Sequence, residues 1–292
     1  MRYLPGVAVM AVLASWGQEA GAQATTDIFL APTEVVNGEL RIGEPHNVTR
    51  RDGYDNQPWF LPDGNAFLYS SQRDGQTDIF RYELATGTSV RVTDTPENEY
   101  SPSLPGDGTR MMVVRWPVDM STGALWWFTP DGRPLEEARG SVARVGYYAF
   151  ADEHRLALFI NDSTQSFMLS DTRTGEAVRV GEGMNGSAPR RIPGADAVSF
   201  QRRGEDGEWW LTRLDVADGA MTPLVRMVDG VPNYTWTPGG TVLAASGNTI
   251  FEWRPGTGEW REVVRFNDPA LQSITRLAIT DAGDRLALVS GR

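Results

Sequence analysis

The sequence predicts an all-β fold: a six-bladed β-propeller of four-stranded antiparallel blades, in which N-terminal strands complete the C-terminal blade. Three observations predict this fold. Turn sequences recur with a period of about 44 residues, hairpin glycines recur at a similar interval, and the chain begins and ends within a repeat. Four short strands separated by tight turns are typical of one propeller blade.

The clearest repeat covers residues 56–95, NQPWFLPDGNAFLYSSQRDGQTDIFRYELATGTSVRVTDT. Its strand-like runs are separated by Pro62-Asp63-Gly64, Arg73-Asp74-Gly75 and Thr86-Gly87. Turn residues of these types, between runs rich in aromatic and β-branched side chains, indicate hairpins. The segment therefore predicts one complete blade.

Two of these turns recur along the whole chain. The turn after the first strand appears as Asp63-Gly64, Asp107-Gly108, Asp152-Glu153, Gly194-Ala195, Gly239-Gly240 and Ala282-Gly283. The hairpin between the third and fourth strands has glycine at 38, 87, 132, 175, 219 and 258. Glycine supplies the positive φ that a tight hairpin turn needs. Six turns of each kind predict six blades.

The two chain ends belong to one predicted blade. The chain stops after two strands of its last repeat, 275–280 and 285–290, whereas Thr26-Asp27-Ile28-Phe29 matches the third strand at Thr77-Asp78-Ile79-Phe80. The N-terminal segment would then supply the two outer strands of the last blade. Such an interlock closes the ring and covers both open sheet edges.

Strand alternation predicts the residues that fill the spaces between blades. Large aromatic rings suit these widening gaps, so most of the ten tryptophans are interpreted as core. The predicted core residues are Trp59, Phe67, Tyr69, Ile79, Tyr82, Met112, Val114, Trp126, Phe128, Phe150, Leu156, Leu158, Phe167, Val198, Phe200, Trp210, Leu214, Trp236, Leu243, Ile250, Trp253, Leu277, Leu286, Leu288, Ile28 and Leu30.

Residues 1–24 have the pattern of a secretory signal peptide. Arg2 precedes the apolar run VAVMAVLA at 7–14, and Ala20-Gly21-Ala22 and Ala22-Gln23-Ala24 both match the small-x-small cleavage rule. The apolar run is too short to span a bilayer, and no later segment qualifies. We therefore expect a periplasmic or secreted bacterial protein, with no membrane span and with one propeller domain over 25–292.

Composition excludes several classes of function. The 292 residues include 27 basic ones, all arginine, 38 acidic ones, two histidines and no cysteine. Without cysteine there are no disulfides, thiolate nucleophiles or zinc knuckles, and without lysine there is no phosphate-binding P-loop. A net charge of −11 argues against a nucleic-acid partner.

The strings NQPWFLPDG, YSSQRDGQTDIFRYEL and RVTDT resemble the repeat of TolB-type six-bladed propellers. The resemblance covers the first and last blades in detail and the others in period and turns. It implies a periplasmic or secreted protein that binds a partner through one face of its propeller. The N-terminal α/β domain of TolB itself has no counterpart here, and no GxSxG turn of a hydrolase is present.

Function in a propeller tends to lie in the loops around the central channel. The loops that lead into the inner strands, with those between second and third strands, combine tyrosine, arginine and amide side chains, a mixture typical of recognition surfaces. Turn geometry explains some of the same residues. The candidate binding residues are Tyr54, Asn56, Gln57, Arg73, Glu99, Tyr100, Arg144, Tyr147, Arg190, Arg191, Asn233, Tyr234 and Gln272.

The sequence favours a binding module over an enzyme. His46 and His154, the two histidines, fall in an outer strand and in a turn, away from the channel. We expect no cofactor: loops such as 73–78 and 204–207 offer oxygen ligands suited to calcium, but turn chemistry explains them better. Two hypotheses remain open, a monomeric module that binds an envelope protein or peptide, and a carbohydrate- or small-ligand-binding propeller that uses channel carboxylates and arginines, with glycan hydrolase or lyase activity as its catalytic form.

Overall fold

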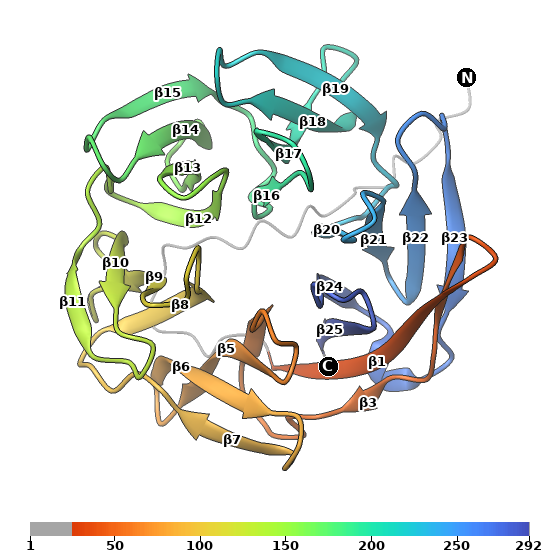
Figure 1. Ribbon diagram of the computed structural model, residues 1–292, viewed down its shortest axis with the longest axis horizontal. Coiled ribbons are helices and arrows are strands. Elements are labelled where there is room, and N and C mark those ends of the chain that lie inside the picture. Colours follow the sequence, from red (N-terminus) through yellow and green to blue (C-terminus); the bar gives the residue numbers. More distant parts are fainter. Residues whose placement is uncertain (1–24, 292) are drawn as a thin grey trace, which may run out of the picture.

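The computed structural model describes residues 25–291 and shows an all-β protein with six antiparallel blades around a central axis (Figure 1). In this described range, the one helical element is a short 3-10 helix, η1 (Pro269–Leu271). The predicted fold class is therefore confirmed, including the number of blades. The predicted signal segment 1–24 lies outside the described residues.

Five blades each consist of four consecutive strands, ordered from the central axis outwards. The first three contain β4 (Asp55–Phe60), β5 (Ala66–Arg73), β6 (Gln76–Glu83) and β7 (Thr88–Arg91); β8 (Asn98–Ser103), β9 (Met111–Trp116), β10 (Ala124–Phe128) and β11 (Pro134–Glu137); and β12 (Val145–Phe150), β13 (Arg155–Ile160), β14 (Ser166–Asp171) and β15 (Ala177–Gly181). The fourth and fifth contain β16 (Arg190–Arg191), β17 (Ala197–Arg203), β18 (Trp209–Asp215) and β19 (Met221–Arg226); and β20 (Tyr234–Trp236), β21 (Val242–Ser246), β22 (Thr249–Trp253) and β23 (Trp260–Arg265).

The sixth blade joins the two ends of the chain. Its inner strands are β24 (Ile274–Ile279) and β25 (Arg285–Gly291), and its outer strands are β1 (Thr26–Val36), β2 (Glu39–Ile42) and β3 (His46–Asn47). β1 pairs with β25 over seven positions, from Thr26 opposite Gly291 to Pro32 opposite Arg285. In Figure 1 the red β1 lies beside the dark blue β25. The predicted interlock is confirmed, because the N-terminal strand covers the sheet edge that β25 would otherwise expose.

Most predicted hairpin glycines have the expected backbone. Asn37 and Gly38 have φ of 53° and 80°, the geometry of a two-residue hairpin turn between β1 and β2. The expectation for Gly258 is wrong: the left-handed residue in that turn is Gly256, with φ of 88°. Pro255 precedes it, and a Pro-Gly pair is suited to the two central positions of a type II turn.

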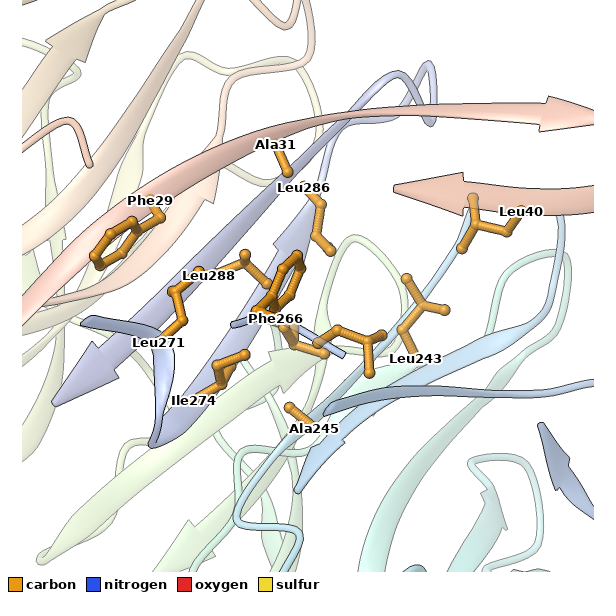
Figure 2. Packing of buried hydrophobic residues seen from close by; sticks show 12 residues of the cluster. Phe29, Ala31, Leu40, Leu243, Ala245, Phe266, Leu271, Ile274, Leu286 and Leu288 are labelled. Atoms are coloured by element: carbon orange, nitrogen blue, oxygen red, sulfur yellow. The ribbon is translucent and has the colours of Figure 1, made fainter. Parts of the chain in front are cut away.

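The core consists of apolar layers between adjacent blades. Figure 2 shows one of them, in which Phe29 of β1 and Leu286 and Leu288 of β25 pack toward Leu243 and Ala245 of β21. Each layer combines side chains from neighbouring sheets, so both faces of a blade are covered. Burial on both faces explains why β9 begins with four consecutive buried apolar residues, Met111 to Val114, instead of alternating.

This two-sided burial also corrects part of the predicted core. Most predicted positions are buried, but five of them are half-buried: Trp59, Trp126, Phe150, Trp210 and Leu30. In β10 the more buried tryptophan is Trp127, at 6% exposure, although the predicted alternation assigned Trp126 and not Trp127 to the core. Alternation separates the two faces of a strand, but it does not identify a single buried face when neighbouring blades cover both.

Among the described residues, no helix is long and apolar enough to cross a membrane.

Candidate functional site

A cavity of about 600 Å³ lies on the central axis of the ring. Residues from the inner strands of all six blades line it, from the middle of those strands to the turns that follow them. The loops that lead into the inner strands lie at the opposite ends of the strands. The cavity therefore opens on the side of the ring where each innermost strand ends and its turn to the second strand begins, which we call the first-turn side. Its lining there includes Pro105, Pro193, Pro238 and Asp281.

Bulges in the inner strands shape the cavity wall. The register of β4 shifts between Asn56 and Trp59, and β8 shifts in the same way. Gln57 and Ser101 have φ of 57° and 53°, and a proline follows each of them. Proline has no N–H to give to the ladder, so it is tolerated where a bulge interrupts pairing. Pro58 and Pro102 consequently present apolar rings to the cavity.

Arg276 of β24 connects three blades at the inner end of this cavity. Its side chain is largely buried, and its Nε donates to Oδ1 of Asn56 in β4 at 3.0 Å. Its Nη2 donates to the hydroxyl of Tyr147 in β12 at 3.1 Å, with the guanidinium carbon 5.0 Å from the centre of that ring. These contacts fix the guanidinium at the axis, between blades one, three and six.

Arg190 of β16 provides a second guanidinium near Arg276. Its Nε donates to the backbone oxygen of Tyr234 at 3.2 Å. Burial, together with the positive charge of Arg276, lowers the pKa of Arg190 to about 10. Within residues 25–291, no carboxylate oxygen lies within 4 Å of either guanidinium.

The charge of the cavity is opposite to that of the chain. Its lining includes three arginines, Arg190, Arg191 and Arg276, and one aspartate, Asp281. The whole chain has a net charge of −11. A cleft lined by one sign of charge concentrates ligands of the other sign. The arrangement is suited to hold an anionic group.

Four of the sequence-predicted site residues line this cavity: Gln57, Tyr147, Arg190 and Arg191. The other nine do not line it. Asn56, Glu99, Tyr100, Asn233 and Tyr234 are buried in the packing between and within blades. Tyr54 is half-buried, and Arg73, Arg144 and Gln272 are exposed. Arg73 lies over the Phe80 ring, and Arg144 donates to the backbone oxygen of Asn161.

Several of the buried residues connect adjacent blades. The Gln57 Oε1 accepts from the Ser101 N–H at 2.7 Å and from the Ser70 hydroxyl at 2.7 Å. The Tyr234 hydroxyl lies 2.8 Å from the Ser199 hydroxyl in the preceding blade. Burial raises the pKa of Tyr234, which keeps its hydroxyl neutral and able to donate. These hydrogen bonds stabilise the contacts between adjacent blades.

Glu99 of β8 is fully buried below the loop that joins blades one and two. Its carboxylate accepts hydrogen bonds from the hydroxyls of Thr93, at 3.1 Å, and Thr95, and the Nε of Arg115 lies 3.8 Å away. Removal from water raises the pKa of Glu99 to about 7. Its partners all belong to the protein, so Glu99 acts here as part of the fold.

Arg276 is the site residue that the sequence analysis missed. It lies five positions before Asp281 of the first turn, as Gln57 lies five positions before Pro62. An arginine within a predicted inner strand, next to Leu277, was the available signal. A charged side chain in an otherwise apolar strand has to face either solvent or a channel.

The two histidines lie outside the channel. His46 is exposed in β3, and His154 lines a second cavity, of about 550 Å³, at the end of blade three. Two acidic groups of that cavity pair with its own arginines, Asp152 with Arg155 and Asp171 with Arg173. The part of the chain described here contains no cluster of three or more histidine, aspartate or glutamate side chains that could hold a metal ion.

The candidate calcium loops form ordinary turns. Asp74 and Gly75 have φ of 53° and 85° between β5 and β6, the backbone of a tight hairpin. Asp78 pairs with Arg91 at 2.8 Å. In the second loop Asp206 accepts hydrogen bonds from the Glu208 N–H and the Trp210 indole.

No protein-family model matches the sequence. One curated relative, an uncharacterised protein of Agrobacterium fabrum, is 23% identical over 87 residues, which is 30% of this chain and 30% of that protein. The chain therefore spans under a third of the length of the curated relative it matches.

Solved structures share the whole fold at low identity. A putative TolB from Agrobacterium tumefaciens has a TM-score of 0.66 and 14% identity, over 92% of this chain and 99% of that one. A Bacteroides thetaiotaomicron protein of unknown function has a TM-score of 0.58 and 11% identity, over 91% of each chain. An oligogalacturonate lyase in complex with manganese has a TM-score of 0.56 and 13% identity, over 85% of this chain and 80% of that one. The fold is that of a TolB-like β-propeller.

Proposed function

We propose that this chain is an exported, monomeric and non-catalytic binding module of the bacterial cell envelope, and that its axial cavity takes a segment of a partner protein or peptide. One observation carries the proposal: a cavity of about 600 Å³, lined by all six blades, is positively charged in a strongly acidic chain. Ligand sites are typically concave, largely apolar and of this size.

The wall of the cavity is suited to a peptide. Pro58, Pro102 and Pro189 present rigid apolar surfaces, and Trp59 and Trp236 add aromatic ones. Flat apolar side chains bury large areas with little loss of conformational freedom, which is why aromatic residues dominate recognition sites. The signal-like segment 1–24 supports export, and the TolB-like fold supports a place in the envelope.

Filling the cavity tests the proposal without removing any core side chain. Ala149 of β12 lines the cavity, so Ala149→Arg would obstruct it. Val178 of β15 is 50% exposed on the outer strand of the same blade, so Val178→Arg is the matched control. We expect a protein captured from envelope extract by the unaltered chain and by Val178→Arg to be lost with Ala149→Arg. Equal capture by all three would place the binding surface elsewhere.

Binding of a carbohydrate is the second candidate, with glycan hydrolysis or elimination as its catalytic form. The aromatic lining favours it, since Trp59, Trp236 and Phe150 could stack on sugar rings. A glycan array and assays on activated glycosides and on acidic polysaccharides test this candidate. Glycan hits that Ala149→Arg abolishes and Val178→Arg retains would support it over the peptide module.

A further inference from the structure

Two guanidinium groups lie together at the inner end of the axial cavity. Arg276 comes from blade six and Arg190 from blade four, and both line the cavity together with Tyr147 of blade three, whose hydroxyl accepts from Arg276 at 3.1 Å. In residues 25–291 neither guanidinium has a carboxylate within ion-pairing distance. Two like charges without a counter-ion repel each other and lose hydration, so an anion between them would stabilise both.

Both side chains retain donors for such an anion. A guanidinium has five N–H donors in a fixed plane. Arg276 gives one bond to Asn56 and one to Tyr147, and Arg190 gives one to the Tyr234 backbone. These bonds hold the groups in place from the protein side. The remaining donors match the two oxygens of a carboxylate, the anion that arginine binds in a bidentate manner.

We propose that Arg276 and Arg190 bind the C-terminal carboxylate of a peptide that enters the cavity end-on, an inference that rests on the proposed function. The depth of the two arginines in the cavity indicates that they bind the end of the ligand chain. A ligand that enters from the first-turn side, past Pro238 and Asp281, reaches Arg276 last. A carboxylate bound at that depth is therefore the terminal group of the ligand.

The side wall favours a peptide over an acidic sugar. Sugars need many hydrogen-bonding partners, but several polar side chains of the wall already bond within the protein. Ser103 bonds to the Tyr148 hydroxyl at 2.8 Å, and Gln57 accepts from the Ser101 N–H. Thr280 donates to Asp284 at 2.7 Å. Much of the remaining wall is proline and aromatic surface, which suits peptide side chains.

The test compares three probes on the full chain by equilibrium dialysis with mass spectrometry. The probes are a tripeptide library with free C-terminal carboxylates, the same library with amidated C-termini, and trigalacturonate. We expect the free-carboxylate library to bind and the amidated one to bind at least about tenfold more weakly, since charge-assisted hydrogen bonds contribute that much.

Arginine variants locate the site. Arg276→Gln and Arg190→Gln should each weaken the free-carboxylate peptides by about tenfold or more and leave the amidated ones unchanged. Arg202→Gln is the control, because Arg202 is exposed on β17 and does not line the cavity. Arg190→Gln is the variant less exposed to misfolding, because among residues 25–291 the Arg190 side chain makes a single hydrogen bond.

Each result decides between the two proposals. If both libraries bind alike and the arginine variants change nothing, the carboxylate site is wrong and the peptide module stands. If trigalacturonate alone binds and depends on both arginines, the anion site stands, but the ligand is a sugar acid and the peptide module fails. If no free carboxylate depends on these arginines, the inference is overturned.

Discussion

The Nε of Arg276 donates to Oδ1 of Asn56 at 3.0 Å, across 220 positions of the chain. The bond joins the innermost strand of the last blade to the innermost strand of the first blade, at the seam where the ring closes. The pairing of β1 with β25 closes the same seam at the outside. Closure therefore has two independent components, a strand ladder and a buried polar contact.

Removal of the N-terminal strands should abolish closure. A chain that starts at Arg50 lacks β1, β2 and β3, which leaves β25 as an open edge and exposes Leu288. We expect it to be aggregated or unfolded by size-exclusion chromatography and circular dichroism. A chain that starts at Thr25 keeps all three strands and should stay soluble. If both chains melt alike, closure contributes nothing to stability.

Trp236 should be one of the most sensitive core positions. It is 8% exposed, and its indole N–H donates to the Ser199 hydroxyl in the neighbouring blade at 2.8 Å. Trp236→Ala is expected to lower the free energy of unfolding by about 3–5 kcal/mol. Urea denaturation followed by circular dichroism measures this change. An unchanged midpoint would mean that the ring does not depend on this contact.

Gln57 should contribute to stability as well as line the cavity. Its Oε1 accepts the Ser101 N–H at 2.7 Å, in a bond that joins blades one and two, and it also accepts the Ser70 hydroxyl at 2.7 Å. Gln57→Asn retains a residue type that tolerates the positive φ of 57°, but its shorter side chain cannot make the bond. We expect a loss of about 1–3 kcal/mol in the free energy of unfolding. Gln272→Asn, at an exposed position, is the control and should unfold like the unaltered protein.

Glu99 should make stability fall as the pH rises. Its pKa is raised to about 7 in the folded state, so the folded protein binds a proton that the unfolded chain has already released. The stabilisation is complete below the ordinary glutamate pKa and is lost as the pH passes through about 7. This one group contributes a slope of at most about 1.4 kcal/mol per pH unit.

Glu99→Gln should remove that contribution. The free energy of unfolding, measured from pH 5 to 8, should decline less steeply in this variant than in the unaltered protein. Glu153→Gln, which removes the same charge from an exposed turn, is the control. Parallel curves for the unaltered protein and Glu99→Gln would show that Glu99 does not titrate in this range.

Local turn chemistry made much of the fold predictable. The six first turns and the six hairpin turns predicted the number of blades. The match between Asp27-Ile28 and Asp78-Ile79 predicted that β1 belongs to the last blade. The wrong expectation at Gly258 was also local, because Pro255-Gly256 offers a better turn two residues earlier. Signals of this kind depend on backbone conformation at one or two residues, so they can be identified in the sequence.

The candidate site was only partly predictable. Tyr147 and Arg190 were identified from their residue types, but Tyr100 and Glu99 were identified by the same reasoning and are buried between blades. Whether such a side chain faces the channel or a neighbouring blade depends on the bulges of the inner strands. A bulge reverses the side to which the following residues point, and although Pro58 and Pro102 mark two of these bulges, the residue types do not say which side that is.

The sequence by itself determined the class of fold, the number of blades and the pairing of the two chain ends in one blade, because these depend on turn signals repeated along the chain. Only the tertiary structure decided which polar groups meet on the axis. Arg276, Asn56, Tyr147 and Arg190 come from four different blades and approach one another when the ring closes. Contacts across a ring depend on the radius and twist of six packed sheets, and those are properties of the whole assembly of blades.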